Sequence, residues 1–374
     1  MILFTKPYIS GKEFEYMQDA AGRGHLSGNG YYTKQCQGFF EKRYGFRRCF
    51  LTTSCTDALE MAAMLLNLGP DDEVIVPSYT FVTTALAFVR HGAKVVFVDS
   101  QKDHPNLDID QLEKLITPNT KAIVPMHYAG NACNMDRIMA LAEKHGLYVI
   151  EDDALAIDAY YKDRPLGGIG HMGCFSFHDT KGIQAGEGGM LVVNDEKLVK
   201  RAEVIWEKGT NRAAFFRGEV DKYGWIDLGS SFQPSELIAA FLYAQLENID
   251  RIQGRRMEIW DTYYEALSPL AEKGTISIPA IPEYATNNAH AFYFICRSPE
   301  ERTALIDHLK KNGIKATFHY QALHASRYFN GNKQANKLPN AEKYTDCLLR
   351  LPLYYEMTEE DVITVVEAVK GFYE

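Results

Sequence analysis

Several features are missing from this sequence, and each absence removes a class of protein. No run of about 18 apolar residues occurs, so we expect no membrane-spanning helix and no membrane partner. Lys and Arg form no basic block and the formal net charge is −9, which argues against nucleic-acid binding. The seven cysteines include no C-x-x-C pair, which argues against a zinc site and predicts reduced thiols in a cytoplasmic protein. The N-terminal residues show neither the basic segment nor the apolar stretch of a signal peptide.

What is present is the composition of an ordinary globular protein. The chain has 374 residues, of which 46% are hydrophobic and 24% are charged. This length allows a large core and predicts two domains. We place a large cofactor-binding domain at residues 1–250 and a smaller C-terminal α+β domain at residues 251–374.

Short apolar runs alternate along the chain with segments whose apolar residues recur at three- and four-residue spacing. Strands separated by helices predict an α/β fold with a mostly parallel sheet that helices cover on both faces. Residues 235–256 read as one long helix leading into the smaller domain. The expected strands are 74–77, 94–99, 122–125, 147–150, 173–177, 190–193 and 291–296, and the other expected helices are 56–68, 80–90, 112–116, 135–144, 301–312 and 359–372.

Lys181 is the leading candidate for a catalytic residue. It follows the apolar run 173–177 and precedes the glycine-rich turn 186–189. A lysine held against apolar surroundings can lose its proton, and a neutral amine attacks carbonyl groups. Asp152 ends an earlier apolar run, and pyridoxal phosphate needs such a pair: the amine holds the aldehyde as a Schiff base, and the acid pairs with the pyridinium nitrogen. The alternative for a lone lysine is a solvated surface charge.

Three further segments could hold such a cofactor. Residues 53–59 begin a helix with hydroxyl groups and free backbone N–H groups, which suit a phosphate, although Ser54 or Thr56 as an ordinary N-cap is the alternative. Phe81 opens the next helix and could stack on a flat ring, or it could be a core aromatic residue. Ser176 lies near the end of the strand before the lysine, where it could hold a phosphate oxygen.

Together these segments resemble the DegT/StrS family of nucleotide-sugar aminotransferases, which are fold type I enzymes dependent on pyridoxal phosphate. The resemblance extends over essentially the whole chain. It rests on the Ser/Thr loop at 53–56, on P-x-x-T-aromatic at 77–81, on the acidic strand end at 149–153 and on F-S-F-x-x-x-K-x-x-x-x-G-E-G-G at 175–189. Near the C-terminus, residues 319–324 fit H-Y-x-x-L-H, and residues 351–353 supply L-P-L.

The resemblance implies a role for each matched residue. Lys181 is the Schiff-base lysine, which also moves the proton between substrate and cofactor. Asp152 partners the ring nitrogen, and Phe81 stacks on the ring. In the family the other subunit completes the phosphate site, so we expect a homodimer. The phosphate would be held by Cys55, Thr56 and Ser176, and by Ser231 of the partner subunit.

Within the family, residues 208–212 and 215–223 resemble the dTDP-4-amino-4,6-dideoxygalactose transaminase group. This implies transfer of the amino group of glutamate to C4 of dTDP-4-dehydro-6-deoxyglucose, in deoxysugar biosynthesis for cell-surface polysaccharides, with no metal. A C3 transaminase, a C4 transaminase giving the glucose epimer, and a non-catalytic sensor of the cofactor or sugar nucleotide are the alternatives. The residues expected to bind substrate are Arg212, Arg217, Lys222, Tyr223, His319 and Tyr320.

Four positions depart from the common family pattern. Leu155 replaces a Gln that bonds the phenolic oxygen of the cofactor, and Asp153 replaces an Ala beside Asp152. Gly182 replaces an Asn and loosens the turn after the lysine. Ser231 replaces an Asn, as it does in the subgroup. Because none of these changes removes the lysine, we expect transamination.

Overall fold

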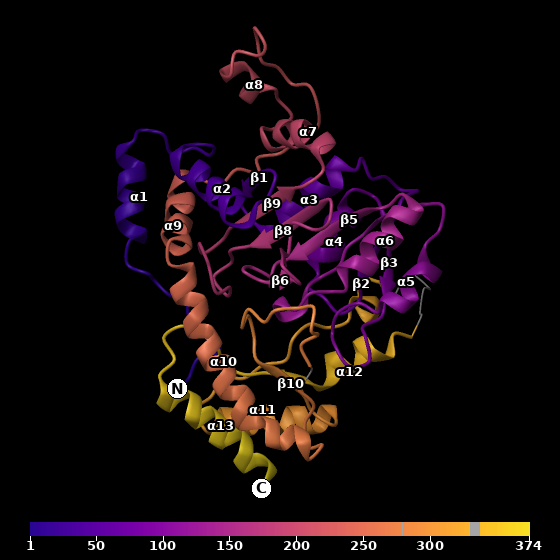
Figure 1. The fold of residues 1–374 in the computed structure, drawn as a ribbon, viewed down its shortest axis with the longest axis vertical. Helices are drawn as coiled ribbons and strands as arrows, with labels where there is room; N and C mark the ends of the chain where they lie inside the picture. The colour runs from indigo at the N-terminus through magenta and orange to yellow at the C-terminus, as the bar shows by residue number, and fades with distance from the viewer. Residues whose placement is uncertain (279, 330–336) are drawn as a thin grey trace.

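The computed structural model describes residues 1–278, 280–329 and 337–374. At its centre is a seven-stranded sheet (Figure 1). The strands lie in the order β1 (Cys49–Thr52), β9 (Gly189–Val193), β8 (Met172–Ser176), β5 (Tyr148–Asp153), β4 (Thr120–Ile123), β2 (Glu73–Pro77) and β3 (Lys94–Val98). The last five pair in parallel, whereas β9 pairs antiparallel with both of its neighbours. This arrangement confirms the expected mostly parallel sheet.

The apolar strands are buried on both faces of this sheet. Val74 and Val76 of β2 belong to one buried cluster, and Ile75 between them belongs to another, as the two-residue repeat of a strand requires. Both faces therefore need a cover of helices. One face is covered by α3 (Cys55–Leu65), α4 (Thr83–Arg90) and α7 (Glu196–Trp206).

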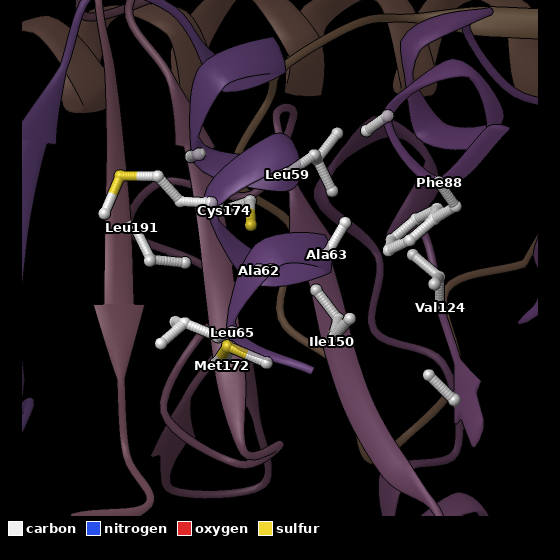
Figure 2. Close-up of a cluster of buried hydrophobic side chains, with 14 of the residues drawn as sticks. Leu59, Ala62, Ala63, Leu65, Phe88, Val124, Ile150, Met172, Cys174 and Leu191 are labelled. Atoms are coloured by element: carbon white, nitrogen blue, oxygen red, sulfur yellow. The ribbon is translucent and has the colours of Figure 1, made fainter. Parts of the chain in front are cut away.

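Helix α3 lies at the centre of the first face. Ser54 caps it by accepting a hydrogen bond from the backbone N–H of Asp57, and the helix contains neither glycine nor proline. Figure 2 shows Leu65 of this helix beside Met172 of the sheet, and Leu59 belongs to the same buried apolar cluster. This packing fixes the start of α3 against the ends of the central strands.

The opposite face is covered in two parts. At the β1 end, α1 (Glu13–Gly22), α2 (Tyr31–Tyr44) and α9 (Glu236–Leu246) pack together. At the β3 end, α5 (Ile109–Leu115) and α6 (Met135–His145) cover the strands. Among the described helices, none combines the length and the apolar character that a bilayer crossing requires.

The prediction of one helix over residues 235–256 is wrong. The chain forms two helices, α9 and α10 (Ile249–Glu272), which are separated at Glu247 and Asn248. The side chain of Asn248 donates to the carbonyl of Ala244 and to the hydroxyl of Ser10. It thus satisfies a terminal carbonyl of α9 that a continuous helix would have bonded itself.

The C-terminal residues form a second cluster at the end of the molecule where both termini lie (Figure 1). Helix α10 begins at Ile249, so the expected domain boundary at residue 250 falls within its first turn. The division of the chain into two domains near this residue stays a proposal. Ile2 packs into the second cluster with residues from 259 onward. Its elements are α10, β10 (Tyr293–Ile295), α11 (Pro299–Lys311), β11 (Leu348–Arg350) and α13 (Glu359–Tyr373).

The remaining elements are short. Helix α8 (Arg212–Phe216) belongs to a segment, residues 207–235, whose middle part projects from the top of the molecule in Figure 1, and none of the residues of α8 is buried. We call residues 207–235 the projecting segment. The others are η1 (Tyr128–Gly130), β6 (Tyr160–Tyr161), β7 (Arg164–Pro165), η2 (Leu323–Ala325) and α12 (Pro339–Cys347).

Candidate active site

A cavity of about 430 Å³ lies where the carboxyl ends of the parallel strands meet the C-terminal part of the chain. Ligands bind at this edge in open α/β sheets. The predicted residues that line the cavity are Cys55, Thr56, Phe81, Asp152, Ser176, Lys181, His319 and Tyr320.

The half-buried Lys181 lies just beyond the end of β8. The pKa of its amine is lowered to about 8, chiefly by removal from water; the positive charge of Arg350 also lowers this pKa, whereas Cys55 and Asp152 oppose the shift. A substantial share of the amine is therefore neutral slightly above neutral pH. This state is the one that attacks carbonyl groups.

Asp152 lies in β5 and is only 4% exposed. Its carboxylate accepts hydrogen bonds from the hydroxyl of Thr84 at 2.6 Å and from the backbone N–H of Ala154 at 3.1 Å. Burial raises its pKa, and the two hydrogen bonds and the charge of Lys181 oppose this shift. A cation placed against this carboxylate would favour its ionised form.

The start of α3 offers a seat for an anion. Ser54 acts as the N-cap, accepting from Asp57 N–H at 3.1 Å, so the capping interpretation holds for that hydroxyl. Cys55 and Thr56, in the first turn, still line the cavity together with Ser176. A Cβ at Gly189 would lie 2.4 Å or less from the backbone of Ser54 and Cys55, so only glycine allows β9 to approach this turn.

Phe81 lies in the loop between β2 and α4 and lines the cavity. It is 55% exposed, so the interpretation as a core aromatic is wrong. Its ring is 6.2 Å from that of Tyr320, measured between centroids. The exposed face of the Phe81 ring is free to stack on a flat ligand.

His319 and Tyr320 form an aromatic wall of the cavity. Their rings are stacked with centroids 3.5 Å apart, and Nδ1 of His319 shares a hydrogen bond of 2.8 Å with the hydroxyl of Tyr128. Burial, and then the charge of Arg350, lower the pKa of His319 well below its ordinary value. The imidazole is therefore neutral at physiological pH.

Sequence reasoning missed Arg256, His290 and Arg350, all of which line the cavity. Arg350 directly precedes the L-P-L motif, and this position was the one available signal for it. Arg256 donates to the carbonyls of Leu353 and His290 and so ties α10 to the C-terminal strands. These contacts depend on tertiary packing, which no local pattern reveals.

Two of the departures from the family pattern have a physical account. A Cβ at Gly182 would lie 3.0 Å from Nε of Arg256, so the absence of a side chain there leaves room for the guanidinium. Leu155 lines the cavity and is 3% exposed, so it presents an apolar surface where the family has an amide.

Asp153 belongs to a separate buried cluster with His127 and Glu151, whose ligand atoms lie within 4.8 Å of one another. Glu151 accepts from the imidazole of His127 at 3.1 Å and from three backbone N–H groups of residues 167–170. Its carboxylate therefore holds that loop against β5. Burial, and then the charges of Glu151 and Asp152, raise the pKa of Asp153 well above its ordinary value.

The other predicted residues do not line this cavity. They belong to the projecting segment, where Arg217 pairs with Glu203 at 2.7 Å and with Glu219 at 2.7 Å. The guanidinium of Arg212 lies 5.2 Å above the ring of Phe216. The residues that the structure leaves apart from the cavity are Arg212, Arg217, Lys222, Tyr223 and Ser231.

The cavity fits pyridoxal phosphate. An amine with a lowered pKa, a buried carboxylate, an exposed aromatic ring and a helix N-terminus with hydroxyl groups all face one space. These groups match the aldehyde, the ring nitrogen, the ring face and the phosphate of that cofactor.

Comparison with known proteins agrees with this chemistry. The chain is 34% identical to the spore coat polysaccharide biosynthesis protein SpsC of Bacillus subtilis, over 98% of this chain and 96% of that protein. The structure of an aminotransferase from Psychrobacter cryohalolentis is similar with a TM-score of 0.92 and 28% identity, over 98% of each chain. The PLP form of the putative sugar aminotransferase Spr1654 from Streptococcus pneumoniae is similar with a TM-score of 0.90 and 26% identity, over 99% of this chain and 97% of that chain.

The chain also matches the sequence model of a protein family. Residues 7–370 match the model of the DegT/DnrJ/EryC1/StrS aminotransferase family. The chain therefore belongs to this family and is a sugar aminotransferase that depends on pyridoxal phosphate.

Proposed function

We propose that this protein transfers the amino group of glutamate to C4 of dTDP-4-dehydro-6-deoxyglucose and forms dTDP-4-amino-4,6-dideoxygalactose. The observation that carries the choice of substrate is the sequence of residues 208–212 and 215–223, which resembles that transaminase group. The relation to a polysaccharide biosynthesis protein of Bacillus subtilis supports a role in making cell-surface polysaccharides.

Each predicted residue of the cavity has a role in this proposal. The cofactor supplies an aldehyde that bonds covalently to amines and a ring that takes up the electron pair of a carbanion. Lys181 binds the cofactor in the resting enzyme and, when released, carries the proton to and from the substrate carbon. Asp152 holds a proton on the ring nitrogen, and Phe81 fixes the plane of the ring.

The phosphate group would lie at the first turn of α3. Cys55 and Thr56 offer backbone N–H groups there, and Ser176 offers its hydroxyl. The Cys55 thiol itself donates to the carbonyl of Cys174 at 3.4 Å, so we assign its contribution to the backbone. His319 and Tyr320 form the wall that faces the substrate.

We further propose that two copies of the chain form the working unit. Trp225, Ile226 and Leu228 of the projecting segment are 81%, 59% and 64% exposed, an unusual density of apolar side chains for a free surface. A second copy of the chain would cover them. Ser231 of the partner subunit would then complete the phosphate site.

The basic residues of the projecting segment would act at the partner's cavity. Arg212 and Lys222 carry no ion pair among the described residues, so they are available to bind the pyrophosphate of the sugar nucleotide. Tyr223 would contact the groups of the nucleotide next to the pyrophosphate. Arg217 already pairs with Glu203 and Glu219. Its first role would be to hold the segment in shape.

A cytoplasmic location is part of the same proposal. All seven cysteines are unpaired and buried in the structure. Free buried thiols are typical of reducing compartments, where nucleotide sugars are made.

The test is an assay with glutamate and dTDP-4-dehydro-6-deoxyglucose, followed by NMR of the product. We expect 2-oxoglutarate and a sugar with an axial amino group at C4. An equatorial amino group would identify the glucose epimer as product. The corresponding 3-keto sugar is assayed in parallel, and amination of that sugar alone would identify a C3 transaminase. Either of these two results would contradict the proposal.

A further inference from the structure

Two buried hydroxyl groups connect the wall of the cavity to the carboxylate of Asp152. The hydroxyl of Thr84 lies 2.6 Å from Oδ2 of Asp152, and the hydroxyl of Thr80 lies 2.7 Å from that of Thr84. Thr80 and Thr84 are 1% and 0% exposed, so neither can bond to bulk water. Buried hydroxyl groups need partners within the protein, and these two find theirs in each other and in the acid. We call Thr80 and Thr84 the threonine relay.

The direction of the relay follows from the number of its protons. An ionised carboxylate only accepts hydrogen bonds, so Thr84 must donate its single hydroxyl proton to Asp152. The oxygen of Thr84 is then left to accept, and Thr80 is the donor. Each bond in such a series polarises the next one, which strengthens the bond that reaches the carboxylate.

Other helical threonines use their hydroxyl groups differently. Thr262, Thr303 and Thr345 each donate to the backbone carbonyl four residues earlier, at 2.8, 2.8 and 3.0 Å. Thr84 is the second residue of α4, and it donates to a side chain of strand β5 instead. Its hydroxyl therefore serves the carboxylate and not its own helix.

The carboxylate of Asp152 is held through both of its oxygens. Oδ2 accepts from Thr84, and Oδ1 accepts from the backbone N–H of Ala154 at 3.1 Å. Because the terminal torsion of an aspartate is otherwise broad, these two donors define the plane of the group. Burial raises the pKa of Asp152, and the bond from Thr84 is foremost among the interactions that lower it. The same bond thus orients the carboxylate and favours its charged form.

The turn that carries Thr84 is itself anchored. Its backbone N–H donates to the carbonyl of Phe81 at 3.2 Å, so Phe81 and the partner of the acid belong to one turn. Farther along α4, Phe88 is buried in the apolar cluster of the first face (Figure 2). Asp152 and Thr80 line the cavity, whereas Thr84 does not. An effect of Thr84 on a bound ligand would therefore pass through Asp152.

We propose that Thr84, oriented by Thr80, is the positioning residue that directs the carboxylate of Asp152 toward the ring nitrogen of pyridoxal phosphate. A carboxylate held in one plane can meet a ring N–H in a charge-assisted hydrogen bond without first losing rotational freedom. The inference rests on the proposed role of Asp152 at the ring nitrogen. It does not depend on the identity of the sugar.

The test measures binding to the cofactor-free protein and requires no turnover. Absorbance titration gives the dissociation constants of pyridoxal phosphate and of the analogue in which carbon replaces the ring nitrogen. Their ratio reports the contact at the ring nitrogen alone, because the two compounds share the aldehyde, the ring face and the phosphate. The variants are Thr84→Val, which removes the hydroxyl, and Thr84→Ser, which keeps it. Thr262→Val is the matched control, because Thr262 is exposed and its hydroxyl bonds within α10.

We expect Thr84→Val to lower the preference for pyridoxal phosphate over the analogue by about tenfold, as for the loss of one hydrogen bond to a charged group. The dissociation constant of the analogue should change by less than about twofold, since the analogue has no ring nitrogen to meet the carboxylate. Thr84→Ser and Thr262→Val should keep the native ratio. Equal weakening of both compounds in Thr84→Val would assign Thr84 a purely structural role and overturn the inference.

A second variant tests the relay even if Thr84→Val does not fold. Thr80→Val removes only the outer hydroxyl and should lower the same ratio by about threefold. An unchanged ratio in Thr80→Val would show that Thr80 does not orient Thr84, contrary to the proposal. In an Asp152→Ala background, Thr84→Val should have no further effect on the ratio. A further loss there would mean that Thr84 acts by another route, and the inference would be wrong.

The native protein separates this inference from the role on which it rests. A native protein that binds both compounds equally would reject the role of Asp152 and the inference with it. A native preference for pyridoxal phosphate that Thr84→Val leaves intact would reject the inference alone. Because no sugar is present, a wrong assignment of the sugar substrate would leave all of these ratios unchanged.

Discussion

One proton on Lys181 determines whether this cavity can react. Loss of hydration and the positive charge of Arg350 lower the pKa of the amine, and Cys55 and Asp152 oppose this shift only in part. The surroundings of Lys181 thus lower the pKa of its amine and favour the neutral form.

The pH dependence of cofactor binding follows from this tuning. Because the folded pKa of Lys181 is about 8, the amine is mostly protonated below that pH and mostly neutral above it. We expect the rate at which the cofactor-free protein captures added pyridoxal phosphate to rise with pH and to level off above a midpoint near 8. The measurement is the growth of the yellow absorbance after mixing. A midpoint near the ordinary lysine value, about 10.4, would contradict the assigned environment.

Replacement of the lysine tests its assignment directly. Lys181→Ala should lower the rate of amino transfer by a factor of at least about 1000, because both the covalent bond to the cofactor and the proton carrier are lost. In the native protein, borohydride should attach the cofactor to the peptide that contains Lys181, as peptide mass analysis would show. Attachment at another lysine would reject the assignment.

The residues of the cavity differ in how visible they are in the sequence. Lys181 and Asp152 were predicted because each follows an apolar run, and the sheet brings strand ends to one edge. Arg350 was missed because an arginine without an acidic partner looks like a surface residue until the fold encloses it. The roles of Arg212, Lys222 and Ser231 stay predictions, since the structure of one chain leaves them outside its own cavity.

At the scale of elements, one carboxylate caps a helix to which it does not belong. The N-cap residue of helix α2 is Gly30, which has no side chain to cap the helix. Glu236, at the start of α9 and 2% exposed, accepts instead from the backbone N–H groups of Gly30, Tyr32 and Thr33. It thereby satisfies donors that every helix N-terminus leaves free.

Loss of this contact should destabilise the protein. We expect Glu236→Ala to lower the free energy of unfolding by about 3 kcal/mol, because three backbone donors lose their acceptor. Urea titration followed by circular dichroism measures the change. Glu258→Ala, at an exposed carboxylate of α10, should change the same quantity by no more than about 0.5 kcal/mol. Equal effects of the two substitutions would show that Glu236 has no capping role.

Element boundaries were predictable only where they depend on local chemistry. The last helix begins as expected, because Thr358 and Asp361 form a capping box. The break between α9 and α10 was not predictable, since Asn248 ends the first helix partly through a contact with Ser10. Strand β1 was not among the expected strands, and its pairing with β9 joins residues that are far apart in the sequence.

At the scale of the whole molecule, the projecting segment is the surface on which we expect the second copy of the chain to bind. We expect the double substitution Trp225→Ser and Ile226→Ser to shift the protein from dimer to monomer, because it removes apolar side chains that a second copy would bury. Light scattering during size-exclusion chromatography measures the mass. The control is Ile363→Ser, at a 52% exposed position of α13, which should remain dimeric. A native protein that is monomeric, or a double variant that is still dimeric, would refute this assignment.

The antiparallel pairing of β9 also has a consequence for how the chain acquires its structure. Among the described residues, β1 pairs with no strand other than β9. Cys49 lies opposite Val192 in this pair, and Gly189 of β9 packs against the first turn of α3. During synthesis the first strand therefore stays without a neighbour until most of the central sheet has left the ribosome. Such non-local closure is slow and leaves an open edge during folding. The anion seat at the start of α3 is consequently completed only after β9 has paired with β1.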